Sequence, residues 1–258
     1  MVQHEFAEKI TRILKADDNV IGLAAAGSWI TNELDEFSDL DLVLVTKDVV
    51  GNSKEKMLTY ANQFGNLLSA FTGEHVGESR LLICLYDNPL LHVDIKFIIL
   101  KEFEYRVENP VILLDTNHQL QDVINKTEAK FPTPDFQWIE NRFWTWVHYA
   151  LLKIGRGEYF ESLDFFGFLR MIVIGPLLHL RNHNLPRGVR KVETQLSKTD
   201  FDLLQSTLSS NKKADLLNAL TNIISLYQGL RTDLYPADIS LNKAENTVLL
   251  YFDKIKNS

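Results

Sequence analysis

The sequence has little cysteine and no long apolar segment. Cys84 is the single cysteine among 258 residues, so no disulfide can form within the chain. It lies in the apolar run LLICLY, which predicts a buried side chain rather than a reactive thiol. No apolar run approaches the roughly 18 residues needed to cross a bilayer, and the N-terminal segment alternates charged and apolar residues, unlike a signal peptide. We therefore expect a cytoplasmic protein with no membrane partner.

The chain also lacks an excess of basic residues. It has 34 acidic and 27 basic residues and a net charge of −7. Proteins that bind nucleic acid without sequence preference usually present a basic surface, because lysine and arginine displace counterions from phosphates. The charge balance therefore disfavours a stable nucleic-acid partner and suits a small acceptor, above all a cationic one.

The two halves of the chain differ in their patterns. In the first half, apolar runs typical of buried strands alternate with amphipathic stretches typical of helices. The segment FPTPD at 131–135 interrupts regular structure, because proline restricts its own backbone and that of the preceding residue. Beyond it the patterns are almost wholly helical. We predict an α+β domain with a mixed sheet and helices at 1–130, followed by an all-α helical-bundle domain at 131–258.

The individual elements follow from the spacing of apolar residues. Strands are expected at 20–26, 39–46, 81–86, 91–100 and 111–114. Helices are expected in the first half at 4–16, 29–36 and 54–71, and in the second half at 136–154, 159–181, 200–209, 214–230 and 243–255. The turn signal Asp87-Asn88-Pro89 predicts that the third and fourth strands form an antiparallel hairpin.

Three aspartates stand in apolar segments. On a strand, Asp39 and Asp41 project from the same side, about 6–7 Å apart at the backbone. Asp94 lies between Val93 and Ile95, where an unpaired charge would be costly. Three crowded carboxylates repel one another and are compensated by a bound cation. Mg²⁺ prefers such oxygen ligands, so Asp39, Asp41 and Asp94 are predicted to form a metal site.

A glycine-serine pair precedes the aspartates. Gly27 and Ser28 lie between a predicted strand and a predicted helix. Glycine there lets the backbone approach a ligand closely, and the following helix N-terminus favours phosphate. The hydroxyls of Ser28 and Ser38 can donate further hydrogen bonds, so this corner is predicted to bind the phosphates of a nucleotide.

Together these motifs resemble a known family. Gly-Ser, then Asp-Leu-Asp after a short gap, and a later Val-Asp-Ile strand resemble the DNA polymerase beta-like nucleotidyltransferase superfamily. With the helical C-terminal half, the chain is similar to bacterial antibiotic nucleotidyltransferases, which modify aminoglycosides or lincosamides. The motifs cover about residues 20–100, and the segments 153–158 and 164–170 extend the resemblance loosely into the second half.

The resemblance implies a reaction and a set of partners. A nucleoside triphosphate, with ATP as the favoured donor, would transfer AMP to a hydroxyl of a small-molecule acceptor and release pyrophosphate. Asp39 and Asp41 would hold Mg²⁺, while Asp94 would either ligate a metal or take the hydroxyl proton. Lys153 would steady the triphosphate, with Arg156 as a second candidate. Residues 1–130 would be the catalytic domain and 131–258 the substrate-binding domain of a monomer or homodimer.

Each motif also has a purely structural interpretation. Asp39 and Asp41 would then lie on an exposed edge strand, Asp94 would pair with Lys96 on its own strand, and Lys153 would be a solvated charge at a helix end. His92 shares the predicted face of Asp94, and a supporting role beside that carboxylate stays open.

Two features of the second half also stay open. The stripe of Trp138, Phe143, Trp144, Trp146 and Tyr149 is expected to be core, although one ring is suited to stack on a base or sugar. Glu158 is either a substrate-binding acid or an ordinary first-turn helix residue.

Two other function classes remain alternatives. The acceptor could be a protein or RNA, or the chain could be a non-catalytic nucleotide-binding module. The extra helical half favours a small acceptor over a macromolecule, and the presence of all three aspartates favours catalysis.

Overall fold

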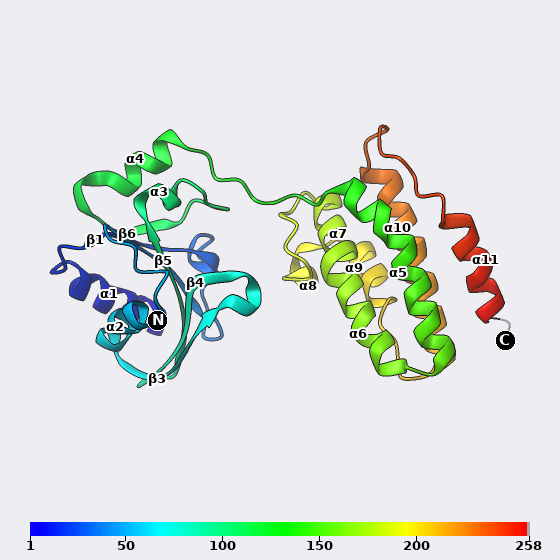
Figure 1. The fold of residues 1–258 in the computed structure, drawn as a ribbon, viewed down its shortest axis with the longest axis horizontal. Coiled ribbons are helices and arrows are strands. Elements are labelled where there is room, and N and C mark those ends of the chain that lie inside the picture. Colours follow the sequence, from blue (N-terminus) through cyan, green and yellow to red (C-terminus); the bar gives the residue numbers. More distant parts are fainter. Residues whose placement is uncertain (257–258) are drawn as a thin grey trace. The chain divides into compact units, whose positions relative to one another are not determined.

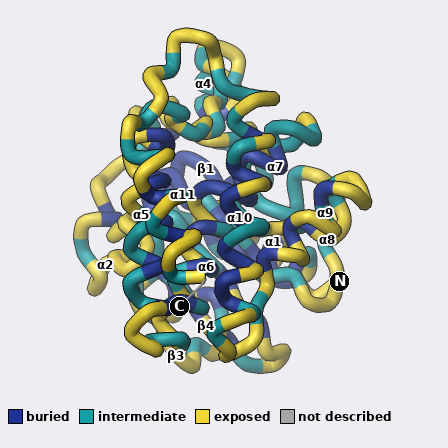
Figure 2. The backbone as a smooth tube through the Cα atoms, turned by 90° about the vertical axis from the view of Figure 1, so that its right-hand side faces the viewer, coloured by how far each residue is buried: buried dark blue, intermediate teal, exposed yellow. Residues whose placement is uncertain are grey.

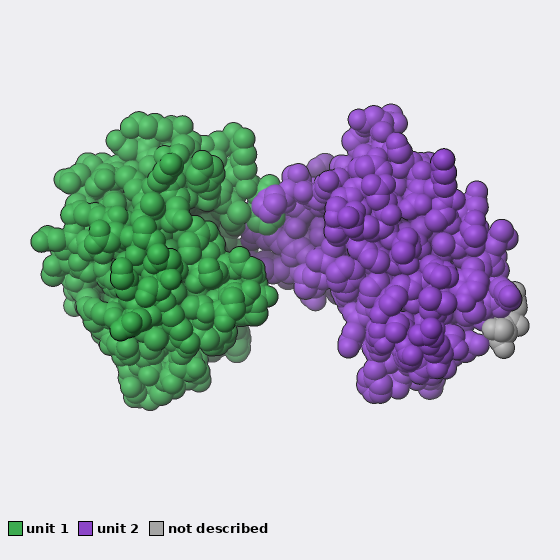
Figure 3. All heavy atoms as spheres, viewed as in Figure 1, with its two compact units in different colours: residues 1–131 green, residues 132–258 purple. Residues whose placement is uncertain are grey.

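A computed structural model describes residues 1–256, which belong to two compact units that divide between Phe131 and Pro132 (Figure 3). The first unit contains a six-stranded sheet with helices, and the second is helical (Figure 1). The predicted fold class is confirmed. The prolines at 132 and 134 lie in the irregular segment before the first helix of the second unit, as expected from their restricted backbone.

The sheet of the first unit has the strand order β3-β4-β5-β2-β1-β6. Its strands are β1 (Val20–Ala25), β2 (Leu40–Thr46), β3 (Asn66–Gly73), β4 (Glu78–Asp87), β5 (Leu91–Ile99) and β6 (Val111–Asp115). β2 and β5 run parallel, and the other neighbouring pairs are antiparallel. β2 therefore lies inside the sheet between β5 and β1, and the edge-strand interpretation of its aspartates is wrong.

Helices cover the two faces of this sheet unequally. Helices α1 (Val2–Leu14) and α2 (Lys54–Phe64) pack with the larger apolar core on one face. The short α3 (Leu100–Phe103) and α4 (Gln119–Lys126) pack with a smaller core on the other face (Figure 1). That second face carries partly exposed polar side chains where β2 and β5 begin, so this part of the sheet is accessible.

The second unit is built on two long helices. Its helices are α5 (Phe136–Arg156), α6 (Tyr159–Leu169), α7 (Gly175–Arg181), α8 (Val192–Gln195), α9 (Lys198–Gln205), α10 (Lys213–Leu234) and α11 (Glu245–Lys256), with a π-helical segment, Arg170–Ile174, between α6 and α7. The Asp135 side chain caps α5 by accepting a hydrogen bond from the Trp138 N–H at 2.9 Å. The buried inner faces of these helices form one core (Figure 2).

One helical stretch of the second unit is more apolar than expected. Within residues 1–256, the stretch Tyr159–Arg181 is long and apolar enough to cross a membrane by length and composition alone. Half of its most apolar window is buried inside the protein, where residues such as Phe166, Leu169 and Leu177 join the helical core. The expectation that no segment is long and apolar enough to cross a bilayer was wrong. Packing against the helical core explains why one side of this stretch is apolar.

Two predicted helices of the first unit differ in the structure. The expected helix at 29–36 is replaced by a single 3₁₀ turn, Gly27–Trp29, and an irregular loop in which Asn32 has a positive φ of 55°. The expected helix at 54–71 ends at Phe64, and its last residues form β3 instead. Leu67 suits either period, and its pairing with Tyr86 of β4 decides in favour of the strand.

Candidate active site

Asp41 and Asp94 are direct neighbours across two parallel strands. β2 and β5 pair in register, with Leu40 opposite Val93 and Asp41 opposite Asp94. Paired residues point to the same face of a sheet, so both carboxylates lie on the accessible face. Leu40 points to the opposite face and is 1% exposed. This agrees with the alternation of side chains along a strand, which puts Leu40 on the opposite side from Asp39 and Asp41.

Asp39 lies next to this pair, immediately before β2. Burial raises the pKa of Asp94 above its ordinary value, and the negative charge of Asp39 raises it further, against the opposing effect of His92. Asp94 therefore has two carboxylate neighbours, Asp41 through the pairing of the strands and Asp39 through its charge. Whether the three act as one site stays a prediction.

Gly27 packs directly against the Asp41 carboxylate. The turn follows β1, and the Ala26 N–H donates a hydrogen bond to the Asp41 carbonyl at 2.9 Å. Gly27 has a φ of +59°, and a Cβ placed on it would lie 2.1 Å from Asp41 Oδ2. Both the backbone conformation and the close approach require glycine here. The glycine-serine corner therefore lies on the same side as the aspartates.

The loop before Asp39 is held by a side chain that the sequence analysis missed. Gln3 of α1 is 3% exposed, and its Nε2 donates to the carbonyls of Asp35 at 2.9 Å and Ser38 at 2.8 Å. The Ser38 hydroxyl donates to Asp35 Oδ1 at 2.8 Å and accepts from the Asp35 N–H. These bonds fix the backbone that presents Asp39. The partners of Gln3 lie 32 and 35 residues away in the sequence, so no local pattern indicated this role.

His92 and Lys96 flank Asp94 on the same strand face. His92 Nε2 lies 2.9 Å from Asp94 Oδ1, and the imidazole is half exposed. Lys96 Nζ lies 2.8 Å from Glu78 Oε2 on β4. The lysine therefore pairs with another strand, and the interpretation of Asp94 as one half of an ion pair with Lys96 is not supported.

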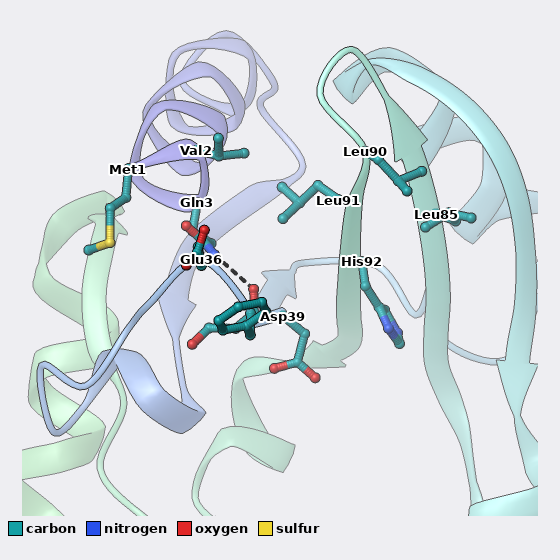
Figure 4. A pocket seen from close by; sticks show the side chains of 11 residues that line it. Met1, Val2, Gln3, Glu36, Asp39, Leu85, Leu90, Leu91 and His92 are labelled. Atoms are coloured by element: carbon teal, nitrogen blue, oxygen red, sulfur yellow. Dashed lines mark hydrogen bonds between the residues drawn. The ribbon is translucent and has the colours of Figure 1, made fainter.

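Two cavities adjoin the aspartates. One, of about 710 Å³, is lined by Asp39, Glu36 and His92 and by apolar side chains from α1 and the β4–β5 hairpin. Figure 4 shows the Asp39 carboxylate and the His92 ring entering it from two separate segments. The other, of about 470 Å³, is lined by Ala26, by Val43 of β2 and by Lys96 of β5. Asp39 thus lines the first cavity, and the second lies farther along the strands that carry Asp41 and Asp94.

A sequence comparison identifies the family. The model of the streptomycin adenylyltransferase family matches residues 1–239. The chain belongs to this family. It is therefore an adenylyltransferase, an enzyme that transfers AMP, as the resemblance of its motifs implied. No curated protein matches the chain in sequence.

Solved structures give distant matches to this adenylyltransferase. An aminoglycoside 6-adenyltransferase from Bacillus subtilis aligns with a TM-score of 0.41 and 17% identity over 99% of each chain. A nucleotidyltransferase-like protein from Exiguobacterium sibiricum 255-15 aligns with a TM-score of 0.38 and 14% identity, over 89% of this chain and 75% of that one. Scores this low add nothing to the assignment of individual residues.

Oxygen ligands for a cation are present in the adenylyltransferase, although they are not gathered as one set. Within residues 1–256, no group of three or more His, Cys, Asp or Glu side chains is arranged to hold a metal ion. Asp39, Asp41 and Asp94 nevertheless offer the carboxylate oxygens that Mg²⁺ prefers, and burial, together with the negative charge of Asp39, raises the pKa of Asp94. The chemistry of these donors fits a divalent cation.

Lys153 lies in the second unit and is ion-paired. Its Nζ lies 2.8 Å from Glu158 Oε2 and 2.9 Å from Glu161 Oε1, near the end of α5. Arg156, its alternative, lies 4.0 Å from Glu158 Oε1. The lysine is not a solvated charge, because its side chain is 15% exposed. Its role toward a triphosphate stays a prediction.

Proposed function

We propose that this adenylyltransferase moves AMP from ATP to a hydroxyl of an amino-sugar antibiotic, with streptomycin as the first candidate, and releases pyrophosphate. The observation that carries the proposal is the pairing of Asp41 with Asp94 across β2 and β5, beside Asp39 and Gly27. Membership in the streptomycin adenylyltransferase family supports the choice of donor and acceptor.

The aspartates divide the work in this proposal. Asp39 and Asp41 would hold Mg²⁺, which supplies positive charge against the triphosphate when bound. Asp94 takes the proton of the attacking hydroxyl, a role suited to a half-buried carboxylate whose Oδ1 lies 2.9 Å from His92 Nε2. The alternative role for Asp94 is that of a third metal ligand.

The phosphate contacts come from the turn after β1. Gly27 leaves room for a ligand against the backbone, and Ser28 offers a hydroxyl donor. Because the expected helix after this turn is absent, these local donors replace the helix N-terminus as the proposed phosphate support. Ser38 acts on the phosphates only if its bond to Asp35 opens, and Lys153 is proposed to contribute its charge from the second unit.

The test is acceptor-dependent release of pyrophosphate. The wild-type chain is supplied with Mg²⁺, streptomycin and either ATP or GTP, and pyrophosphate is measured by a coupled assay. Asp41→Asn removes one carboxylate charge without changing side-chain size and is expected to lower turnover at least about 1,000-fold. Asp18→Asn, an exposed aspartate of the same unit, is the matched control and should retain full activity.

Two results would contradict the proposal. Unchanged turnover in Asp41→Asn would remove the catalytic assignment. Labelled ATP whose label ends in protein or RNA rather than in a small product would replace the acceptor class. ATP binding without turnover across a panel of amino sugars and lincosamides would favour the non-catalytic alternative.

A further inference from the structure

Lys96 is a cation on the same strand face as Asp94. The two residues lie two positions apart on β5, so their side chains project from one side, about 6–7 Å apart at the backbone. Directly opposite Lys96 lie Val43 of β2 and Leu81 of β4, and neither can pair with an ammonium group. On its own strand, the nearest carboxylate to Lys96 is that of Asp94. The flexible stem of a lysine spans such a distance, so Lys96 is a competitor for any cation at Asp94.

In the structure Lys96 is turned toward Glu78 at the beginning of β4. Its Nζ lies 2.8 Å from Glu78 Oε2, and its side chain is 35% exposed. Burial holds the pKa of Asp94 above its ordinary value, whereas an ammonium bound to this carboxylate would lower the pKa. The pairing with Glu78 therefore keeps the positive charge of Lys96 away from Asp94.

The Glu78 carboxylate is itself held in place by Arg80. Nε and Nη2 of Arg80 donate to Oε1 and Oε2 of Glu78, each at 2.7 Å, in a bidentate pair of well-defined geometry. The remaining nitrogen, Nη1, donates to Glu102 Oε1 at 2.8 Å. Glu102 Oε2 in turn accepts from the Ile99 N–H at 3.0 Å, at the end of β5. Glu78 is thus fixed relative to the strand whose lysine it holds.

The ammonium group has room to move if this partner is lost. Arg80, Lys96 and Glu102 border the cavity of about 470 Å³ that lies along β2 and β5. Because Lys96 lies at the edge of open space, no core packing prevents its side chain from turning back along the strand.

We propose that Glu78 is a positioning residue that holds the Lys96 ammonium away from Asp94, so that the carboxylates of the site stay available to a divalent cation. The inference rests on the proposed function, in which Asp39, Asp41 and Asp94 meet a metal ion. Without the charge of Glu78, Lys96 turns toward Asp94 and forms an ion pair with the oxygens that the cation needs.

Binding of Mn²⁺ to the full-length chain, in the absence of nucleotide, tests this role. Mn²⁺ takes oxygen ligands as Mg²⁺ does, and free Mn²⁺ is measured by electron paramagnetic resonance. Asp41→Asn is expected to abolish binding and so locates the site. Glu78→Gln keeps the side-chain size and removes the charge that holds Lys96. We expect it to weaken Mn²⁺ binding about tenfold, because a unit positive charge beside a partly exposed site opposes a divalent cation at this scale.

A second substitution separates positioning from a purely structural role. Glu78→Gln combined with Lys96→Met also removes the released ammonium, and it should restore the dissociation constant to within twofold of the wild type. Loss of a structural ion pair would not be repaired by removing its second partner. Glu102→Gln is the matched control, because it takes away the other carboxylate partner of Arg80 and leaves Lys96 with Glu78. This control should bind Mn²⁺ within twofold of the wild type.

The contrary outcomes are distinct from failure of the proposed reaction. The inference is overturned if Glu78→Gln binds Mn²⁺ within twofold of the wild type, or if Lys96→Met does not restore the binding that Glu78→Gln loses. An equal loss in Glu102→Gln also overturns it and assigns the effect to the fold around Arg80. A wild-type chain that binds no Mn²⁺ overturns both the inference and the metal site of the proposed function. Glu78-dependent binding without pyrophosphate release would refute the reaction and leave the positioning role intact.

Discussion

The two units use buried acidic side chains in opposite ways. In the helical unit, Glu140 is fully buried and surrounded by donors, including the Tyr227 hydroxyl, the Arg231 guanidinium and the Asn242 N–H. In the sheet unit, Asp94 is half-buried beside other carboxylates, with His92 as its neighbour. A carboxylate saturated by donors stabilises a fold, whereas one crowded by like charges is available for a cation or a proton.

Among substitutions that compare matched positions in the two units, the largest effect is expected at Gly27, which touches the sheet site. Gly27→Ala would place a Cβ 2.1 Å from Asp41 Oδ2 at a φ of +59°, so the carboxylate must move. We expect turnover to fall more than about 100-fold, because small displacements of reacting groups are costly. Acceptor-dependent pyrophosphate release measures this.

Gly157 of the helical unit is the matched control. It also has a positive φ, of 78°, but a Cβ there meets nothing within 4 Å. Gly157→Ala should keep its turnover within twofold and lose about 1–2 kcal/mol of stability for the left-handed backbone. Equal loss of activity in both variants would show that backbone strain, not the Asp41 contact, is responsible.

The second prediction compares one acidic residue of each unit, Glu140 and Asp94, by the effect of its substitution on stability and on turnover. Glu140→Ala leaves the Tyr227 hydroxyl and the Asn242 N–H without this acceptor and removes one of the two carboxylate partners of Arg231. We expect it to lower the free energy of unfolding by about 3–5 kcal/mol, because each buried donor left without an acceptor costs about 1–3 kcal/mol. Asp94→Asn should change that free energy by less than about 1 kcal/mol, while it removes most of the turnover. Urea titration followed by tryptophan fluorescence measures the first, and the pyrophosphate assay measures the second.

The comparison breaks down if the two results are reversed. A stable Glu140→Ala chain with impaired turnover would place Glu140 in the chemistry. An Asp94→Asn chain that unfolds easily would make Asp94 a structural residue.

The smallest predicted effect concerns stability in acid. Hydrogen bonds from Arg80 and Lys96 lower the pKa of Glu78 to about 2, from an ordinary 4.5. A carboxyl with a lowered pKa in the folded state stabilises the fold above its unfolded pKa and loses this contribution as the pH falls toward 2. Because the group is partly exposed, we expect the loss to be about 1 kcal/mol.

Glu78→Gln isolates this contribution. The variant should be less stable than the wild type near neutral pH, and the difference should shrink between about pH 4.5 and pH 2. Urea titrations at a series of pH values measure it. A difference that is independent of pH would assign the effect to packing rather than to charge.

The sheet site was predictable because its spacing is local. Alternation along a strand is enough to place Asp39 and Asp41 on one side and Leu40 on the other. The apolar neighbours of Asp94 indicated that it belongs to the same site, but the parallel pairing that sets it opposite Asp41 depends on contacts between distant segments and was not predicted. Gln3, which fixes the loop before Asp39 from α1, gave no such local pattern.

The helical unit was harder to predict for the same reason. Helical spacing placed the aromatic stripe on α5, but the rings that Trp146 and Tyr149 contact, Phe168 and Phe165, belong to α6. The pairing of Lys153 with Glu158 and Glu161 likewise joins the end of one helix to the start of the next. The same limit explains β3, where pairing with β4 overrode a pattern that also suited a helix.

The close contact between Gly27 and Asp41 also leads to an expectation for related sequences. Any relative that carries a side chain at the equivalent position must displace the neighbouring carboxylate, even if all three aspartates are retained. We therefore expect relatives with a glycine at this position to keep the site geometry, and relatives with another residue there to lose it even when the three aspartates are present. The position can be read from an aligned sequence.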